Sequence, residues 1–396
     1  MNAPARPPEG RVPSLGENAQ RQEATAASAL DWSGASNVLC VRLDNLGDVL
    51  MTTPALRALK LSRPGRRITL LCSGAGALLA PHLPSVDEVI AYEAPWVKNH
   101  RGPDPGPDLA MIERLRAGRY DAAAIFTVYS QSALPAALMC MLAGIPRILA
   151  HSRENPYRLL THWIKDDAPM DGGRHEARRQ LDLVASVGAR APTETLEFAV
   201  QPRDRRAVQE KLARRGVRDL GSCIVVHAGA SAPSRRYPPE LFAQVVRQLA
   251  ATAPVVLTGG SGERALVEHV DTLSGHRAIN TAGELSLGEL GALLAEAAVL
   301  VSNNSGPVHI AAAVGTPVAD LYALTNPQHA PWGIEHRLLS HDVPCKYCYR
   351  SVCPEGHHAC LAGVEPERAV RAAQELLDMR RRMPLPASPT SRRAAA

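Results

Sequence analysis

Short runs of apolar residues recur along this chain, and stretches with helical spacing separate them. The first run, NVLCVRL at 37–43, is rich in β-branched residues, which is typical of a buried strand in a parallel sheet. Similar runs follow at 67–73, 86–93, 121–129 and 146–151. Between them, apolar residues return every three or four positions. The pattern predicts a doubly wound α/β domain.

The same rhythm starts again after a charged helical segment at 202–216. The strand-like runs of this second part lie at 223–230, 254–260, 277–283, 298–306 and 316–324. A chain of 396 residues is long enough for two separate cores. Because ligands bind at the carboxyl ends of the strands in such folds, two doubly wound domains are expected to face a shared central cleft.

These patterns set the expected domain boundaries. One Rossmann-like domain is expected at 36–200, a second at 201–365, and a closing helix at 366–380. The ends at 1–35 and 381–396 lack apolar periodicity and are expected to be disordered.

Two segments depart from the regular alternation. Residues 151–173 carry no clear helix or strand pattern and are predicted to form a long loop. Pro54 lies inside the helical stretch 44–61, so the helix is expected to kink there or to start again after Thr53.

Composition narrows the class of protein. Hydrophobic residues make up 45% of the chain and charged residues 21%, as in a soluble globular protein. No apolar run approaches the length of a membrane-spanning helix, and the first residues lack the apolar centre of a signal peptide. We therefore expect a cytoplasmic protein. The formal net charge of +5 is too small to indicate nucleic-acid binding.

The eight cysteines fall into two groups. Four lie in apolar runs and are expected to be core residues: Cys40, Cys72, Cys140 and Cys223. The other four, Cys345, Cys348, Cys353 and Cys360, cluster in CKYCYRSVCPEGHHAC. Their ligand types suit a metal, but the spacing is not that of a paired zinc ribbon, so free thiols are expected in a reducing compartment.

The segment VSNNSGPVHIAAAVGTP at 301–317 carries the clearest candidate binding site. It predicts a strand, a polar turn and a short helix, with Asn304 or Ser305 as N-cap and Gly315 at the end. A helix N-terminus in this position can bind phosphate, and His309 lies on the same helical face as Ser305. The alternative is an ordinary strand–helix connection with a surface histidine.

Each of three further residues has two alternative interpretations, one chemical and one purely structural. Asp48 is either a general base or a carboxylate that stabilises a helix N-terminus. Arg235 either neutralises a diphosphate or is solvated surface charge. Glu263 either accepts hydrogen bonds from ribose or stabilises a helix N-terminus. Neither GxGxxG with a downstream acidic residue nor GxxxxGK[ST] is present, which disfavours dinucleotide redox and P-loop chemistry.

Four motifs together resemble glycosyltransferase family 9, the heptosyltransferases of the lipopolysaccharide inner core. They are VRLDNLGDVLMTTPALRALK, VVHAGASAPSRRYPPELFAQVV, AGELSLGELGALLAEAAVLVSNNSGPVHIAAAVGTP and CKYCYRSVCPEGHHACL, in the order of the family. The cysteine-rich segment is most similar to the heptosyltransferase II branch. The resemblance covers about residues 37–379 and implies a GT-B fold, with the donor held by the second domain and the acceptor by the first.

The resemblance also assigns roles to residues. Asp48 matches the catalytic base that activates an acceptor hydroxyl for inverting transfer, and Arg235 matches a basic residue that steadies the departing diphosphate. Asn45 and Gly47 would lie on the acceptor side. The expected donor-binding residues are Gly229, Ala230, Ser231, Glu263, Leu285, Asn304, Ser305, Gly306 and His309. Asn304 departs from the family, where Asp is frequent, and this leaves the donor's identity open.

The resemblance implies an ADP-sugar donor, no cofactor and no catalytic metal. The expected acceptor is a lipid-linked glycan at a membrane surface, reached by a monomeric cytoplasmic enzyme at the inner face of the membrane. Two other interpretations remain at this point: a GT-B sugar-nucleotide epimerase or hydrolase, and a non-catalytic glycan-binding homologue. Acceptor-dependent release of ADP would separate transfer from both.

Overall fold

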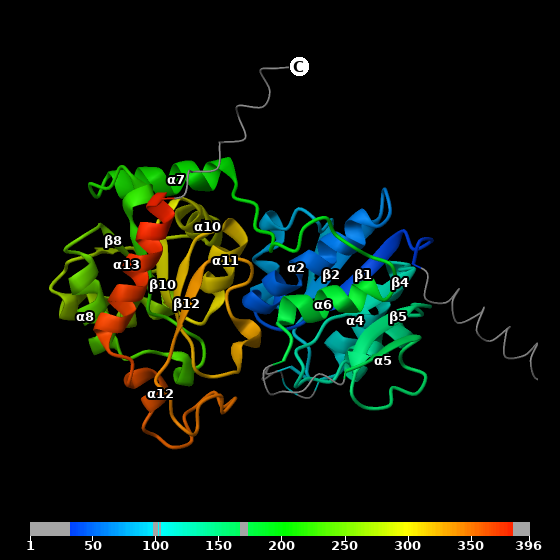
Figure 1. Ribbon diagram of the computed structural model, residues 1–396. Helices are drawn as coiled ribbons and strands as arrows, with labels where there is room; N and C mark the ends of the chain where they lie inside the picture. The colour runs from blue at the N-terminus through cyan, green and yellow to red at the C-terminus, as the bar shows by residue number, and fades with distance from the viewer. Residues whose placement is uncertain (1–31, 98–101, 103, 167–172, 383–396) are drawn as a thin grey trace, which may run out of the picture.

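The computed structural model describes residues 32–97, 102, 104–166 and 173–382, and it contains two six-stranded parallel sheets (Figure 1). The first sheet has the order β3-β2-β1-β4-β5-β6. Its strands are β1 (Asn37–Arg42), β2 (Arg67–Cys72), β3 (Glu88–Ala91), β4 (Ala122–Ile125), β5 (Ile148–Ser152) and β6 (His162–Lys165).

The second sheet repeats this topology. Its order is β12-β11-β10-β7-β8-β9, so both sheets place their first strand next to their fourth. Its strands are β7 (Ile224–His227), β8 (Val255–Thr258), β9 (Ile279–Asn280), β10 (Val299–Asn303), β11 (Val318–Leu321) and β12 (His336–Leu339). The predicted architecture of two doubly wound Rossmann-like units is confirmed, and the point where the order reverses lies after β1 and β7.

Helices cover the faces of both sheets. In the first half these are α2 (Leu46–Leu61), α3 (Gly74–Ala77), η1 (Ala80–His82), α4 (Gly106–Ala117), α5 (Leu134–Leu142) and α6 (Glu176–Ala185). In the second half they are α7 (Pro202–Ala213), η2 (Leu220–Ser222), η3 (Pro233–Arg235), α8 (Pro239–Leu249), η4 (Ser261–Glu263), α9 (Arg264–Ser274), α10 (Leu287–Glu296), α11 (Gly306–Val314), η5 (Pro327–His329), α12 (Ala359–Ala362) and α13 (Pro366–Arg382).

Pro54 lies inside one continuous helix, α2, so a second helix start after Thr53 is wrong. A proline cannot donate the hydrogen bond that the carbonyl four residues earlier would accept. Here the Thr53 hydroxyl donates to that carbonyl, on Leu50, at 2.6 Å. The side chain thus replaces the missing backbone donor, and the helix continues to Leu61.

The sequence patterns missed two short edge strands and shifted two boundaries by a few residues. The predicted loop at 151–173 contains β6, and β12 was not expected; each has only four residues. Trp32 and Ala35 are buried, so the packed structure begins before residue 36. At the other end, α13 continues to Arg382. The disorder predicted for 1–31 and 383–396 lies outside the described residues.

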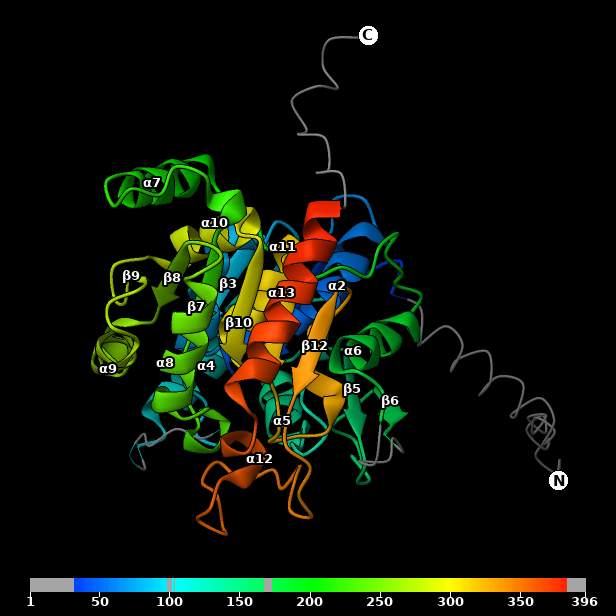
Figure 2. The same ribbon diagram turned by 60° about the vertical axis from the view of Figure 1, so that its left-hand side comes forward.

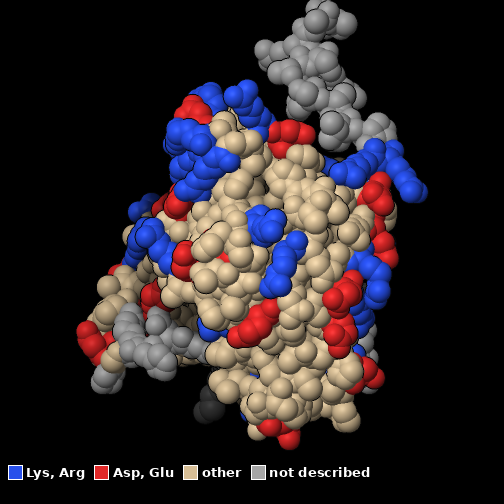
Figure 3. Space-filling model, turned by 90° about the vertical axis from the view of Figure 1, so that its left-hand side faces the viewer, with Lys and Arg blue, Asp and Glu red and all other residues tan. Residues whose placement is uncertain are grey.

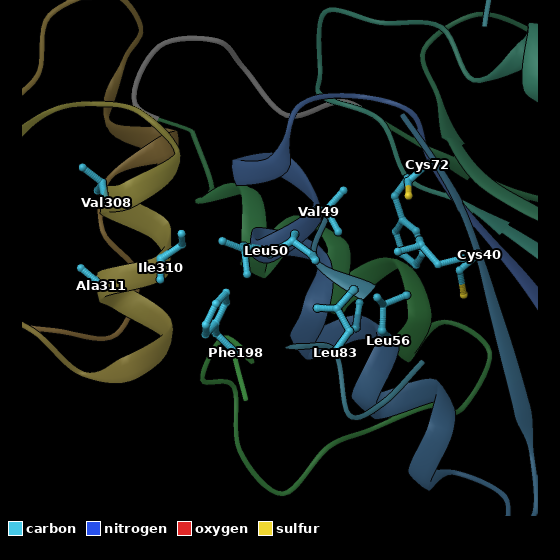
Figure 4. Close-up of a cluster of buried hydrophobic side chains, with 14 of the residues drawn as sticks. Cys40, Val49, Leu50, Leu56, Cys72, Leu83, Phe198, Val308, Ile310 and Ala311 are labelled. Carbon is cyan, nitrogen blue, oxygen red and sulfur yellow. The ribbon is translucent and has the colours of Figure 1, made fainter. Parts of the chain in front are cut away.

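One hydrophobic cluster joins the two halves of the protein. It contains core residues of the first sheet, residues of the second sheet, and the facing sides of α2 and α11. Figure 4 shows Ile310 on the side of α11 that faces Phe198 and Leu50 of α2, while Val308 lies on the other side of the helix. Because this core is shared, it fixes how the carboxyl ends of the two sheets approach each other.

The last described element, α13, packs on β10, β11 and β12 (Figure 2). On the face shown in Figure 3, Lys and Arg side chains gather at the end that carries α7, whose sequence is PRDRRAVQEKLA. Acidic residues are interspersed elsewhere on this face. No helix in the described parts of the chain combines the length and apolar character needed to cross a membrane.

Candidate functional site

Asp48 lies in the first turn of α2, directly after β1. Its side chain is 17% exposed and forms an ion pair with Arg42 at 3.3 Å. The second carboxylate oxygen accepts a hydrogen bond from the Asn45 backbone N–H at 3.2 Å. Burial raises the pKa of Asp48, while the guanidinium groups of Arg42 and Arg235 oppose the rise. The carboxylate is therefore fixed in orientation and more basic than an exposed one.

Arg42 pairs with two further carboxylates. Its Nε lies 3.0 Å from Asp44, its Nη1 lies 3.1 Å from Glu176, and the guanidinium is fully buried. Burial raises the pKa of Asp44, whereas Glu176 has a lowered pKa because Arg42 and Arg179 outweigh its burial. One cation thus holds three acidic groups at the end of β1, including Asp48.

The N-terminal ends of α2 and α11 meet directly. A Cβ atom on Gly47 would lie 2.6 Å from Cδ2 of His309, and one on Gly306 would lie 3.3 Å from Leu46. Only a residue without a side chain fits at position 47 at this separation. The expected acceptor-side residue Gly47 therefore touches the expected donor-side residue His309.

The first turn of α11 has no side-chain cap. Ser305 is the N-cap residue, but its hydroxyl donates to the Asn303 carbonyl at 3.2 Å instead of accepting from the helix. Gly315 ends the helix in the left-handed conformation, as predicted. An uncapped N-terminus keeps backbone donors and the positive end of the helix dipole available for an anion.

Arg235 ends η3 and lies near the same junction. Its Nε is buried without a hydrogen-bond partner, and no ion pair involves it among the described residues. Its charge opposes the rise in the pKa of Asp48 and Asp320 that burial causes, and it adds to the fall in the pKa of His309. The neighbouring Arg236 instead is exposed and donates to the Ala230 carbonyl at 2.8 Å. Of the two arginines, Arg235 faces the site.

Glu263 and Gly229 are brought together. A Cβ on Gly229 would lie 1.9 Å from Oε1 of Glu263, so this glycine makes room for the carboxylate. Oε2 of Glu263 accepts from the Gly260 backbone N–H at 2.7 Å and lies 3.7 Å from His227. Glu263 therefore does stabilise a turn, and it does so beside the small-residue loop that contains Ala230 and Ser231.

Asn304 is held by two acceptors from other loops. Its side-chain amide donates to Asp320 at 3.0 Å and to the His329 carbonyl at 3.2 Å. Burial raises the pKa of Asp320 to about 7, and its Oδ1 has no hydrogen-bond partner among the described residues. Asn304 is thus a buried anchor rather than an exposed cap.

Three histidines surround this junction: His309 is buried, and His175 and His329 are half-buried. Burial lowers the pKa of His309 to about 3 and the pKa of His329 and His175 to about 4. His175 is the N-cap of α6 and contacts the Ala330 carbonyl through Nε2 at 2.8 Å. All three are neutral at pH 7. His309 is therefore buried, whereas the alternative of an ordinary strand–helix connection required a surface histidine.

The remaining expected residue, Leu285, lies in the loop before α10 and packs against the shared core. Sequence reasoning missed Arg42, Asp44, Glu176 and Asp320. Arg42 and Asp44 sit in the VRLD segment beside Asp48, so a charged residue inside an apolar strand was a usable signal. The sequence carried no usable signal for Glu176 or Asp320, because their partners are remote in the chain.

Two adjoining pockets open at the carboxyl end of the first sheet. One, of about 280 Å³, is largely apolar and includes Leu43, Trp96 and Phe126; the other, of about 410 Å³, is polar. They share Ser130, Gln131 and Ser132 as a common wall. Gln131 donates to Asp44, which links this wall to Arg42.

The cysteine-rich segment contacts η3 through Ser234, the residue before Arg235. Cys345 Sγ is 3.8 Å from His357 Nε2, and all eight cysteines are free. Within the described residues, no group of three or more Cys, His, Asp or Glu side chains is arranged to hold a metal ion. His358 Nε2 contacts the Ser234 carbonyl at 2.8 Å, so the segment supports η3 and through it the position of Arg235.

Two Rossmann-like units, joined at the N-terminal ends of α2 and α11, define the class: a two-domain α/β protein of the GT-B fold. The sequence profile of glycosyltransferase family 9 (heptosyltransferase) matches residues 109–359. The chain therefore belongs to this family.

Individual relatives agree with this assignment. The chain is 26% identical over 359 residues to lipooligosaccharide heptosyltransferase 2 of Haemophilus influenzae, covering 86% of this chain and 99% of the relative. Over 345 residues it is 24% identical to lipopolysaccharide heptosyltransferase 2 of Escherichia coli, covering 84% and 96%. A family 9 glycosyltransferase from Veillonella parvula superposes with a TM-score of 0.72 at 22% identity, covering 89% of this chain and 99% of that one.

Proposed function

We propose that this protein is an inverting heptosyltransferase that moves a heptose from ADP-heptose to a glycan acceptor of the lipopolysaccharide core. The observation that carries the proposal is the position of Asp48, an oriented carboxylate of raised pKa where the two halves meet. The named relatives, which are heptosyltransferases, support the choice of sugar.

In the proposed reaction, Asp48 accepts the proton of an acceptor hydroxyl. The oxygen attacks the anomeric carbon of the donor from the opposite side, and the bond to the ADP oxygen breaks with inversion. Arg42 keeps the base in orientation. Negative charge on the departing diphosphate is stabilised by Arg235 and by the uncapped N-terminus of α11.

The donor is proposed to bind along the second half. Gly229, Ala230, Ser231, Ser305 and Gly306 line the phosphates, with backbone close enough for N–H contacts. Glu263 accepts from ribose hydroxyls, and Leu285 covers the adenine. Asn304 and His309 lie next to the sugar. No metal or cofactor takes part in the proposed mechanism.

On the acceptor side, Asn45 and Gly47 flank the base. The proposed acceptor is lipid-linked, so the enzyme would work as a cytoplasmic monomer at the inner face of the membrane. Reconstitution with vesicles that carry the acceptor would test this placement, because activity should then depend on vesicle concentration.

The decisive experiment compares Asp48→Asn with Asp44→Asn. Both remove a carboxylate from Arg42, but only Asp48 is proposed to move a proton. We expect kcat to fall about 10²- to 10⁴-fold in Asp48→Asn, with unchanged ADP-heptose affinity by calorimetry, and to fall far less in Asp44→Asn. Full activity of Asp48→Asn, or release of ADP at the same rate without acceptor, would refute the proposal.

A further inference from the structure

The polar pocket of the first half does not include Asp48 in its lining and has no role in the mechanism above. It is lined by Tyr129, Ser130, Gln131, Ser132, His151, Ser152, Arg153, Glu154, Asp166 and Arg179. Its volume of about 410 Å³ falls at the lower end of the range for small-molecule sites. It is therefore large enough for one small polar group.

Two buried groups in its wall have unused hydrogen-bonding capacity. The His151 Nε2 atom bonds the Arg179 carbonyl at 3.2 Å, while its Nδ1 atom has no partner among the described residues. Asp166 binds Arg179 through Oδ2 at 2.5 Å and leaves Oδ1 without one. Burial lowers the pKa of His151, so its ring is neutral and Nδ1 accepts hydrogen bonds. The two atoms without a partner, His151 Nδ1 and Asp166 Oδ1, are thus both hydrogen-bond acceptors.

The charges that line the pocket cancel. Arg153 and Arg179 supply two positive charges, and Glu154 and Asp166 supply two negative ones. Arg179 is already paired with Asp166, and the Arg153 guanidinium lies 4.8 Å from the centre of the Tyr129 ring. A phosphate needs surplus donors and positive charge, whereas unused acceptors in a neutral wall suit a group with several O–H donors.

A chain of buried ion pairs connects this wall to the base. Asp166 binds Arg179, Arg179 Nη1 lies 3.6 Å from Glu176, and Glu176 lies 3.1 Å from Arg42. Arg42 in turn holds Asp48. The relative position of pocket and base is therefore fixed by side chains that are almost fully buried.

We propose that the polar pocket binds an uncharged sugar ring of the acceptor, other than the sugar that carries the attacking hydroxyl. Its hydroxyl groups donate to the acceptors of the wall, and the neighbouring apolar pocket with Trp96 covers a less polar part of the same glycan. The inference rests on the proposed transfer function and names the part of the acceptor that the enzyme reads beyond the reacting sugar.

Glu154→Gln tests this inference, because Glu154 is an exposed residue of the pocket and its loss should not affect folding. With ADP-heptose and a deacylated inner-core oligosaccharide as acceptor, we expect the acceptor KM to rise about tenfold. The KM for ADP-heptose should not change. The matched control is Glu210→Gln on the exposed face of α7, which should leave both values unchanged.

Ser130→Phe provides a second variant, since Ser130 is exposed and a phenyl ring there would fill the pocket. It should raise the acceptor KM at least as much, at an unchanged Tm. If the wild type transfers heptose and both variants keep the normal acceptor KM, the pocket inference is wrong while the proposed function stands. No transfer by the wild type would instead refute the proposed function.

Arg153→Ala, assayed with phosphorylated and dephosphorylated acceptor, separates a sugar from a phosphate. We expect similar changes in KM for the two acceptors. A loss confined to the phosphorylated acceptor would overturn the assignment of an uncharged sugar.

Discussion

At the end of β1, one buried guanidinium faces three carboxylates, whereas at the end of β10 the positive groups have no acidic partner. Arg42 is neutralised by Asp44, Asp48 and Glu176. Arg235 forms no ion pair with a described side chain, and the first turn of α11 has no side-chain cap. In the first half, carboxylates of the protein itself neutralise the buried guanidinium. In the second half, the positive groups are free to bind the negative charge of a substrate.

The difference matches the two tasks of a transferase. A base must be held in one orientation and kept unprotonated, which an internal ion network provides. A leaving diphosphate brings its own charge, and a site already filled with carboxylates would repel it. The neutral histidines His309 and His329 agree with this, because they add no further charge to the second half.

The largest expected effect comes from breaking the network of the first half. Arg42→Met leaves Asp44 and Asp48 without their ion-pair partner and leaves Glu176 with Arg179 alone, so we expect the free energy of unfolding to fall by about 3–5 kcal/mol. Urea unfolding measures this. The matched control is Arg67→Met, which removes an exposed pair with Glu88 at 3.9 Å and should cost less than about 1 kcal/mol. Equal losses would show that the network adds no stability.

Arg235→Ala should act on catalysis. Because Arg235 has no internal partner, its removal should leave stability unchanged but lower kcat about 10²- to 10³-fold. Arg236→Ala is the control, since that side chain is exposed and points to the Ala230 carbonyl. Steady-state kinetics with ADP-heptose separates the two. Similar losses in both variants would contradict the assignment of Arg235 to the diphosphate.

The histidines of the junction should make stability depend on pH. In the folded protein the pKa of His309 is lowered to about 3 by burial, so between pH 6.5 and 3 the unfolded chain binds more protons. Stability is therefore complete above pH 6.5 and is lost as pH falls. His309→Gln should reduce this slope by up to about 1.4 kcal/mol per pH unit.

Urea unfolding at pH 7.5 and 5.5 checks the slope. The exposed His269 provides the control His269→Gln, which should leave the pH dependence as it is. An unchanged slope in His309→Gln would mean that His309 takes up its proton without disturbing the fold.

The smallest expected effect concerns Asn304. Asn304→Asp replaces a hydrogen bond to Asp320 with two carboxylates 3 Å apart, which should cost about 1 kcal/mol at pH 8. The pKa of Asp320 is already about 7, so one carboxyl is protonated at pH 6 and the cost should shrink. Thermal unfolding at both pH values measures the difference.

The control for this variant is Asn280→Asp, beside Glu268 on the surface at the same 3.0 Å. Solvent screens that pair, so its cost should be smaller at pH 8. A larger loss of stability in Asn280→Asp than in Asn304→Asp would contradict the assignment of Asn304 as a buried anchor.

Local sequence patterns were sufficient to predict an element when its structure depends only on its own residues. Apolar runs of β-branched residues located ten of the twelve described strands. The failures, β6 and β12, are four-residue edge strands whose pairing, not their composition, makes them strands. Trp32 was assigned to a disordered end because its neighbours are polar, although it packs into the core and its carbonyl accepts from Arg66.

The sequence by itself determined the two repeated α/β halves and put Asp48, Arg235 and the turn at 304–306 after strands, where ligands bind. Only the tertiary structure decided that His309 rests on Gly47, and that Arg42 pairs with Glu176, 134 residues away. The physical reason is that hydrophobic period and turn chemistry act over a few residues. Ion pairs and close backbone contacts instead depend on how remote segments pack.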